Sequence, residues 1–470
     1  MRKALILAMG YLEAGLPEAA RDAAREALET GDDGESHFVL GCALERLEQS
    51  EAALPHLRRA AELCPHDATI RHAFGLCLYR RGEPDAALDH LRHSVAHDAN
   101  PDFAETLGAC LMTLLRPDEA EPHLRRVAEA RPGDPTAWAN LGAALVDVNR
   151  CEDAIVACDR ALAADPAHVE AHMSRALANL LAGDWAAAWP EYEWRWRRPV
   201  FQAAYPDPAC PRWRGEALGR AARLWVRGEQ GFGDHVQFAR FVPLAAKRAG
   251  CPVVISAPPA LHRLLAAIPG VAACVATQAR PDGCVAEIPM MSLPGLFETV
   301  PETVPGRFPY LSAPEGPVLP EAGGRPRIGV VWGDKPKPRS RAIDPRLIAD
   351  ALEGLDLAVF GLQADDRAAG IPPGWIDLRP ELTDFAATAA LIRQMDALVS
   401  VDTAALHLAG GLGVPVYILL VKGADWRWMR DRTATPWYPS ARLLRQERPR
   451  DWSRPLAELR AALAARDYDR

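Results

Sequence analysis

Three loops in the C-terminal half carry the residue types best suited to chemistry. The first is Gly228–Asp234 (GEQGFGD), a glycine-rich segment that follows the apolar run Leu224–Val226 and ends on a carboxylate. Glycine permits positive φ and close backbone approach, and a carboxylate at a helix start is favoured by capping and by the helix dipole. Asp234 begins a predicted helix that extends to about residue 250. It is therefore either a helix N-cap or a general base that projects into a cleft between two lobes.

The second loop, residues 330–344 (VVWGDKPKPRSRAID), concentrates basic side chains after a predicted strand. Its cations are Lys335, Lys337, Arg339 and Arg341. A local basic cluster in an otherwise acidic chain favours an anion-binding site at the carboxyl end of that strand. A solvated basic loop is the alternative.

The third loop joins a strand to a helix within residues 400–420 (SVDTAALHLAGGLGVPVYILL). The strand ends at Asp402, and the small residues Thr403, Ala404 and Ala405 leave the first backbone N–H groups of the helix open to a phosphate. His407 lies one turn further on. We interpret it either as a packed core residue or as a group that donates a proton to the phosphate or positions the helix.

A further segment, residues 422–446, follows the last long strand and begins KGADWRW. Residues from it and from the earlier loops are expected to line the cleft: Gln230, Gly231, Gly233, Gln237, Trp332, Asp425 and Trp426. The glycine spacing after the first strand departs from G-x-G-x-x-G, which disfavours a nicotinamide cofactor. No D-x-D pair ends a strand, so no bound metal is expected there.

Histidines are the other metal-binding candidates, and ten of the thirteen precede residue 200. His90, His93 and His97 share a helical spacing, as do His168 and His172. No carboxylate or cysteine lies at a matching offset, which favours surface or partly buried histidines over zinc ligands.

The elements that must position these loops are alternating strands and helices. Short apolar runs read as buried strands, and helical patterns separate several of them: Leu224–Val226, Val253–Ile255, Ile328–Trp332, Leu357–Leu362, Leu398–Val401 and Val416–Val421. This alternation predicts parallel sheets of the doubly wound kind, with ligands beyond the carboxyl ends of the strands. A proline- and glycine-rich stretch, Pro301–Pro326, divides the region into two Rossmann-like lobes, 222–318 and 325–446. A last amphipathic helix, about 454–466 within 447–470, is expected to pack back across them.

The N-terminal half shows an internal period. Gly41, Gly75, Gly108 and Gly142 recur every 33 or 34 residues, and an alanine series tracks with them: Ala20, Ala53, Ala87, Ala120, Ala154 and Ala188. Small residues at this period mark where paired helices touch. The pattern resembles the tetratricopeptide repeat, with about six helix pairs over residues 1–198. The resemblance implies an all-α superhelix whose groove binds a protein or peptide partner, with a spacer or a dimerisation arm as the alternative.

A tryptophan- and proline-rich junction, residues 199–221 with the preceding Asp184–Arg198, connects the two halves. Aromatic side chains bury large areas at little entropic cost, so the segment is expected to fix the last repeat to the next domain. Stacking of Trp194 or Trp196 on a sugar or nucleobase is the competing interpretation.

Composition sets the outer limits. The chain has 470 residues, enough for two or three domains, and a net charge of −8, which disfavours general nucleic-acid binding. Ten cysteines are scattered without a C-x-x-C pair, a usage typical of buried thiols in a reducing compartment. No stretch approaches 18 uninterrupted apolar residues, so no membrane span is expected. We therefore expect a cytoplasmic protein.

Together the residues of 222–446 resemble the heptosyltransferase-like (ninth) family of bacterial glycosyltransferases, which have the GT-B fold. The most specific segments are EQGFGDHVQFARFVPL, SVDTAALHLAGGLGVPVYILL and DWRWMRDRTATPWYPSARLLRQ, and the preceding repeats with WPEYEWRW match the branch that carries tetratricopeptide repeats. The chain departs from the family at Gln237, where those enzymes carry histidine, and at Gly333–Asp334, where the branch carries asparagine.

The resemblance implies a role for each matched residue. Asp234 would be the general base, Lys335 and Arg341 would hold the donor diphosphate, and Asp402 would contact the donor sugar. The amides of 403–405 would bind phosphate, with a nucleotide-diphosphate sugar as co-substrate and no other cofactor.

The resulting hypothesis is an inverting, metal-independent glycosyltransferase whose protein acceptor is recruited by the repeats. A glycan acceptor, with the repeats as an assembly device, stays open, and so does a homo-oligomer. The competing class is a non-catalytic adaptor whose α/β half is a degenerate nucleotide-sugar-binding domain.

Overall fold

A computed structural model of the chain describes residues 2–207, 209–276, 278–306, 309–333, 341–364 and 370–468. The chain divides into two compact units. We call Met1–Val148 with Val156–Ala171 the repeat unit, and Asn149–Ile155 with His172–Arg470 the sheet unit. Residues 149–155 and 172–198, which the sequence analysis places in the repeat array, fall within the sheet unit in this division.

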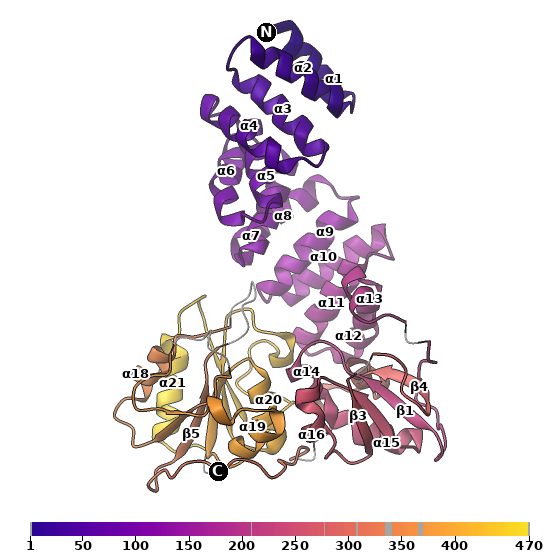
Figure 1. Cartoon of the computed structure of the whole chain (residues 1–470), viewed down its shortest axis with the longest axis vertical. Helices are drawn as coiled ribbons and strands as arrows, with labels where there is room; N and C mark the ends of the chain where they lie inside the picture. The colour runs from indigo at the N-terminus through magenta and orange to yellow at the C-terminus, as the bar shows by residue number, and fades with distance from the viewer. Residues whose placement is uncertain are drawn as a thin grey trace. The chain divides into compact units, whose positions relative to one another are not determined.

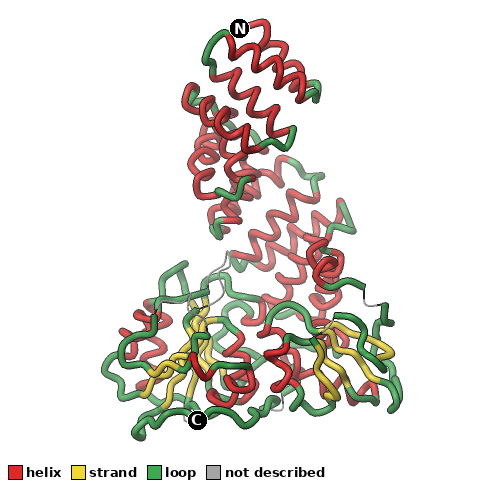
Figure 2. Tube along the Cα trace, viewed as in Figure 1, coloured by secondary structure: helices red, strands yellow, loops and turns green. Residues whose placement is uncertain are grey.

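Helices make up the repeat unit (Figures 1 and 2). Successive helices pair with one another and with the next pair, as the period predicted. They are α1 (Arg2–Glu13), α2 (Pro17–Glu29), α3 (Gly34–Arg46), α4 (Ser50–Leu63), α5 (Ala68–Arg80), α6 (Pro84–His97), α7 (Pro101–Thr113), α8 (Pro117–Ala130), α9 (Pro135–Asp147) and α10 (Cys151–Ala164), followed by α11 (Val169–Ala182), which runs into the sheet unit.

Recurring caps define where the first helix of each pair begins. Asp33, Asp67, Asn100 and Asp134 each accept hydrogen bonds from backbone N–H groups in the first turn of α3, α5, α7 and α9. These caps recur every 33 or 34 residues, the same period as the glycines. Each cap satisfies N–H groups that have no acceptor within the helix.

The periodic glycines lie where the helices of a pair touch. A Cβ added at Gly41 would come within 2.6 Å of Leu57, and one at Gly108 within 2.6 Å of Leu124. The periodic alanines are fully buried in the same contacts: Ala20, Ala53, Ala87 and Ala120. Close backbone approach therefore requires the small residues that the sequence places there.

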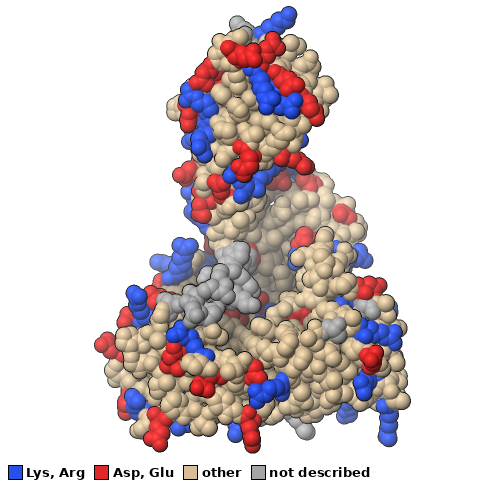
Figure 3. All heavy atoms as spheres, viewed as in Figure 1, with Lys and Arg blue, Asp and Glu red and all other residues tan. Residues whose placement is uncertain are grey.

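Acidic and basic side chains are interspersed over the face of the repeat unit in Figure 3. Some form exposed ion pairs between helices, such as Arg92 with Glu119 (2.8 Å). Exposed pairs of this kind contribute about 0–1 kcal/mol each. They therefore add little to the stability of this unit.

Two parallel sheets organise the sheet unit, which confirms the predicted two-lobed α/β fold (Figure 2). Sheet A has the order β3-β2-β1-β4 and forms the first lobe. Its strands are β1 (Arg223–Arg227), β2 (Val253–Ser256), β3 (Val271–Val275) and β4 (Cys284–Pro289). Sheet B has the order β10-β9-β8-β5-β6-β7 and forms the second lobe. Its strands are β5 (Arg327–Val331), β6 (Ala358–Gly361), β7 (Ile376–Asp377), β8 (Ala397–Val401), β9 (Val416–Leu420) and β10 (Ala441–Arg445).

Helices of the sheet unit connect these strands and cover them (Figure 1). They are α12 (Trp185–Tyr192), α13 (Pro199–Ala204), α14 (Phe232–Phe238), α15 (Val242–Ala249), α16 (His262–Leu265), α17 (Leu293–Leu296), α18 (Pro345–Leu352), α19 (Phe385–Ile392), α20 (Ala404–Leu412) and α21 (Ser453–Ala464). Buried residues of α21, among them Leu459 and Leu463, belong to the core of the second lobe with Val399 and Leu419. The C-terminal helix therefore packs within that lobe.

The predicted long helix after Asp234 is instead two helices. A 3-10 turn, Ala239–Phe241, separates α14 from α15. Pro243 lies in the first turn of α15, where its missing N–H costs nothing, but it could not sit inside a continuous helix. The proline therefore sets the break.

Tryptophans of the junction are packing residues of the sheet unit. Trp185 is fully buried and stacks on Trp437 with ring centroids 4.9 Å apart. The indole N–H of Trp189 donates to the Thr299 carbonyl over 2.7 Å. Because Thr299 belongs to the first lobe and Trp437 to the second, α12 is attached to both lobes.

Trp194 and Trp196, the proposed stacking residues, also have protein partners. The ring of Trp194 stacks on His172 with centroids 3.6 Å apart, and the Arg197 guanidinium lies 3.8 Å from its centroid. Trp196 packs edge-on against Phe201, with centroids 5.9 Å apart. These contacts account for both rings without a ligand.

Candidate functional site

The order in which the chain adds strands to sheet B reverses between β5 and β8. The chain runs outward from β5 to β6 and β7, returns to β8, and continues on the other side to β9 and β10. Val331 pairs with Ser400, so the residues that follow the two strands emerge at one level. Such a switch point is where open α/β sheets bind ligands. The predicted donor-site residues Asp402 and Thr403 follow β8 at this point.

Asp402 is buried at this edge and pairs with Arg341. The Arg341 guanidinium donates to the Asp402 carboxylate over 2.8 Å and to its backbone carbonyl over 3.0 Å. Burial raises the pKa of Asp402 to about 6, against the opposing charge of Arg341. The structure thus brings together these two residues, which are 61 positions apart in sequence.

The helix α20 begins directly after this pair. Thr403 is its N-cap, and the residues 403–405 are only half buried. The Thr403 hydroxyl lies 3.1 Å from that of Ser400. Because the first N–H groups of a helix lack acceptors within it, and the helix dipole favours negative charge there, this end can hold an anion.

Asp234 lies at the start of α14 in the first lobe. It is the third residue of the helix, not the N-cap: Gly231 is the N-cap, and its N–H donates to the Asp234 carboxylate over 2.7 Å. The other carboxylate oxygen accepts a hydrogen bond from Arg427 of the second lobe. The side chain is 17% exposed, so the carboxylate keeps access to solvent.

Arg427 is the centre of the polar network between the lobes. Besides Asp234, its guanidinium contacts Asp425 over 2.7 Å and Gln237 over 2.8 Å, and it lies 4.6 Å from the ring centroid of Trp426. Burial by itself would lower the pKa of Arg427, but Asp425 and Asp234 raise it above its ordinary value, so the guanidinium stays charged. Burial opposes ionisation of Asp425, but Arg427 lowers the pKa of that carboxyl below its ordinary value.

The helices α14 and α20 pack against each other at their N-terminal ends (Figure 1). A Cβ added at Gly233 would lie 2.8 Å from the His407 ring and 3.6 Å from the Ala404 Cα. Only glycine therefore lets the two helices approach this closely. The residue next to Asp234 is in contact with the first residue of α20.

His407 is buried in that contact. Its Nδ1 lies 2.7 Å from the Tyr438 hydroxyl, and its ring is stacked with Trp428, the centroids 5.7 Å apart. Burial lowers the pKa of His407 well below its ordinary value, and Arg427 and Arg240 lower it further. Of the roles considered for this neutral ring, packing and positioning of α20 fit its contacts.

The remaining predicted residues divide into two groups. Gln230 adjoins the site, where its N–H donates to the Tyr205 hydroxyl over 2.6 Å, and Gln237 reaches Arg427. Trp332 is buried in the core of the second lobe against Trp375, and Trp426 is buried among aromatic rings. Lys335, predicted to hold the donor diphosphate, lies outside the described residues.

Sequence reasoning missed a buried ion pair at the corresponding edge of sheet A. Both Glu229 carboxylate oxygens accept hydrogen bonds from the fully buried Arg195, each over 2.9 Å. Glu229 also accepts from the Met291 N–H over 3.1 Å, so it joins the ends of β1 and β4. The available signal was a lone glutamate directly after a buried strand, together with arginines in the tryptophan-rich junction.

No group of three or more His, Cys, Asp or Glu side chains within the described ranges is arranged to hold a metal ion. His93 and His97 stack with ring centroids 4.0 Å apart, and burial lowers the pKa of His90. All ten cysteines are free thiols.

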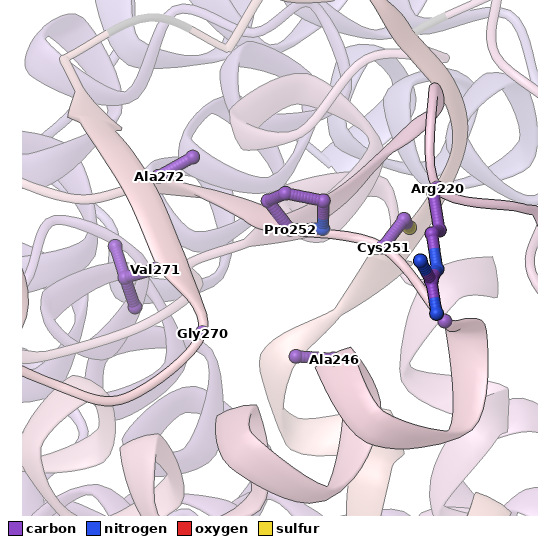
Figure 4. Close-up of a pocket in the computed structure, with 8 residues that line it drawn as sticks. Arg220, Ala246, Cys251, Pro252, Gly270, Val271 and Ala272 are labelled. Atoms are coloured by element: carbon purple, nitrogen blue, oxygen red, sulfur yellow. The ribbon is translucent and has the colours of Figure 1, made fainter.

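A cavity of about 580 Å³ opens in the first lobe at the edge opposite the strand carboxyl ends (Figure 4). Its walls come from the end of α15 and from residues that precede or begin β2 and β3: Arg220, Ala246, Gly250, Cys251, Pro252, Gly270, Val271 and Ala272. Arg220 is the single charged residue among them. The cavity is separate from the network around Asp234 and offers little chemistry.

Comparison with known proteins identifies the repeats. Residues 21–166 and 139–199 match two family models, each described as a tetratricopeptide repeat. The N-terminal part of the chain therefore consists of tetratricopeptide repeats, which are scaffolds for protein interactions. Every helix in the described part of the chain is too short or too polar to cross a bilayer.

One curated relative spans both halves. The chain is 26% identical to Protein FlbA of Caulobacter vibrioides, over 93% of this chain and 84% of that protein. Solved structures align with the repeats. YrrB, described as a tetratricopeptide protein with an unusual peptide-binding site, is 22% identical over 38% of this chain and 93% of its own, with a TM-score of 0.36. PilF of Pseudomonas aeruginosa is 18% identical over 44% of this chain and 91% of its own, also with a TM-score of 0.36.

Proposed function

We propose that the sheet unit is an inverting, metal-independent glycosyltransferase of the GT-B type, and that the repeats recruit its protein acceptor. One observation carries the proposal: the half-exposed N-terminal end of α20 lies against Gly233, next to the carboxylate of Asp234. A candidate base from one lobe thus adjoins a candidate anion site from the other. Direct displacement of a nucleotide from a sugar needs both groups within reach of one substrate.

In the proposed reaction Asp234 accepts the proton of an acceptor hydroxyl. The hydroxyl oxygen forms a bond to the anomeric carbon from the face opposite the nucleotide, which inverts the configuration. The bond between that carbon and the diphosphate oxygen breaks, and the nucleoside diphosphate leaves with the electron pair. General-base assistance of this kind contributes roughly 10²–10⁴-fold.

Arg427 and the Gly231 N–H would act as positioning groups for this base. They hold the two carboxylate oxygens of Asp234 in one orientation. Arg427 also pairs with the Asp425 carboxylate. The positive charge of the guanidinium is therefore shared between two carboxylates, Asp425 and Asp234. The remaining exposure of the Asp234 side chain is where the acceptor hydroxyl would approach.

The departing diphosphate would be stabilised by the first amides of α20, with Arg341 nearby through its pair with Asp402. Fixed donors aimed at developing charge are commonly the largest contribution to catalysis. The resemblance adds Lys335 to this set. Asp402 would contact the donor sugar, in keeping with its place at the switch point.

The test compares Asp234→Asn with the native protein and with Asp282→Asn, a matched change at an exposed aspartate of the first lobe. Purified chains are offered a panel of nucleotide sugars, and donor binding and nucleotide release are measured separately. Asp234→Asn should lose transfer and donor hydrolysis by roughly 10²–10⁴-fold while keeping donor binding, with a lower melting temperature because the charge pair with Arg427 is lost. Asp282→Asn should change none of these. Native activity in Asp234→Asn refutes the role of the base.

A second candidate is a non-catalytic adaptor with a nucleotide-sugar-binding domain. The observation that favours it is the engagement of both Asp234 oxygens, since a base that is already paired is less available for a proton. The adaptor predicts donor binding by the native chain without nucleotide release under any acceptor. It also predicts that Asp234→Asn leaves donor binding and nucleotide release unchanged.

A further inference from the structure

The outer face of α1 is apolar although it is open to solvent. Ile6 is 63% exposed, Leu7 47% and Met9 43%, while Ala4, Leu5 and Ala8 on the opposite face are buried in the repeat unit. Three large apolar side chains side by side on this edge therefore call for a partner.

The same face is complementary to itself. Lys3 and Glu13 are both exposed and lie at its two ends, with Gly10 between them. When a second α1 is laid antiparallel across position 8, Lys3 meets Glu13 of the other copy, Ile6 meets Gly10, and Leu7 meets Met9. Each of these pairs occurs twice, because a two-fold interface repeats every contact.

The glycine supplies a notch at the right place. A Cβ added at Gly10 would find nothing within 4 Å in its own chain, so the residue is not required for packing inside the repeat unit. A residue without a side chain opposite Ile6 lets two helices approach closely, as the periodic glycines do within the repeats. The ten helical steps from Lys3 to Glu13 rise about 15 Å, the length of one short helix contact.

We infer that α1 is a self-association surface, on which a second copy of this chain packs antiparallel about residue 8. The apolar residues would form the centre of the contact, and the two Lys3–Glu13 pairs would fix its direction. A contact of this length is small for a protein interface, so association is expected to be reversible and to depend on protein concentration.

The first experiment measures self-association of the full chain by sedimentation across a wide concentration range. Ile6→Glu should weaken the dimer by roughly tenfold or more, because it would bury a charge in the contact. Val318→Glu, a matched change at another exposed apolar residue (79% exposed), should leave it unchanged. Gly10→Ala fills the notch without a clash inside the chain and should also weaken association.

Charge exchange tests the antiparallel geometry itself. Lys3→Glu and Glu13→Lys should each weaken self-association roughly five- to tenfold, since each places like charges opposite one another twice. The double variant should recover native association, and the two single variants mixed together should form a mixed dimer. Circular dichroism confirms that each variant keeps its helices.

Three results would overturn the inference. They are a chain that stays monomeric at every concentration, a dimer that Ile6→Glu leaves intact, and a double charge exchange that fails to restore association. In the first case the face belongs to a different occupant. In the other two the dimer forms through another surface.

Discussion

The two sheets of the second half end in contrasting ways at their switch points. In sheet A the gap beyond β1 and β4 is filled by Glu229 and Arg195, whose side chains are 1% and 0% exposed. In sheet B the residues beyond β5 and β8 include the half-exposed start of α20 and the Asp402–Arg341 pair, in which the Arg341 side chain is 31% exposed. Among the residues that the structure describes, the first edge holds fully buried side chains and the second holds partly exposed ones.

Both edges contain a carboxylate paired with a guanidinium, but only the pair in sheet B is partly exposed, which makes it the candidate for binding a ligand. An ion pair sealed from water with both oxygens satisfied contributes to stability or specificity, but no ligand can reach it. A carboxylate that is buried beside one exposed guanidinium and an open helix end has a raised pKa and room for a ligand. The two-lobed fold therefore uses its first switch point to fix the junction and its second as the candidate binding edge.

Breaking the buried pair at the edge of sheet A should produce the largest effect. Glu229→Gln removes the more buried of the two carboxylates that pair with the buried Arg195 charge, the other being Glu193 over 2.8 Å. Breaking a buried ion pair typically costs about 3–5 kcal/mol. Chemical unfolding of the native and variant chains measures the loss in free energy of unfolding. Glu302→Gln, at an exposed position of the first lobe, serves as the matched control.

Replacing both partners distinguishes a lost pair from a lost side chain. The double variant Arg195→Met with Glu229→Leu should recover much of the stability, because apolar residues of similar size carry no desolvation cost. If Glu229→Gln alone cost less than about 1 kcal/mol, Glu193 or water would be enough to hold the Arg195 charge, and the contrast with sheet B would disappear.

Titration at the edge of sheet B should give the next largest effect. Asp402 has a pKa of about 6 in the folded chain and an ordinary value of 3.8. Because the folded-state value is the higher one, its contribution to stability is present below about pH 4 and is lost as pH rises to about 6. At roughly 1.4 kcal/mol per unit, the loss is about 3 kcal/mol at most.

Asp402→Asn isolates this contribution. The asparagine cannot ionise, so the stability of the native chain relative to the variant should fall between pH 4 and pH 6 and stay level above pH 7. Unfolding at a series of pH values measures the difference. A difference that stays level in this window and rises with pH only below about pH 4 would show that Arg341 outweighs burial and that Asp402 is ionised throughout the window.

The sequence predicted the central strands of both sheets but not the strands at the edges. β1, β5 and β8 are continuous apolar runs because both of their faces are buried. β3 is a run of small apolar residues and valines that is only half buried, and β7 has only two residues. β10 is flanked by the polar residues Ser440 and Gln446. Its two leucines, Leu443 and Leu444, lie between arginines, so the apolar run is too short to predict a strand. Edge strands are defined by their partners, which a single sequence does not reveal.

The candidate site shows the same limit. Asp234, Asp402 and residues 403–405 lie directly after strands or glycines, so local pattern predicted them. The Asp234–Arg427 contact joins residues 193 positions apart, and the Arg195–Glu229 pair joins a junction to a strand end. Nothing in the local sequence distinguishes Arg427 from its neighbour Arg430, which pairs with Glu152 instead. Long-range ion pairing was therefore the part that the sequence could not supply.

The smallest predicted effect concerns a third ion pair, which joins the lobes at their surface. Arg263 of α16 contacts Asp384 at the start of α19 over 2.9 Å, and its side chain is 55% exposed. Arg263→Gln should cost only about 0.2–1 kcal/mol of unfolding free energy, and the cost should vanish in about 1 M salt, because solvent and ions screen an exposed pair. Asp384→Ala should cost more, since Asp384 also caps α19 through the Ala387 N–H over 2.7 Å. Chemical unfolding at low and high salt measures both variants. A salt-independent loss above about 2 kcal/mol in Arg263→Gln would mean that solvent exposure does not determine how much an ion pair stabilises this protein. The distinction between the two sheet edges would then lose its physical basis.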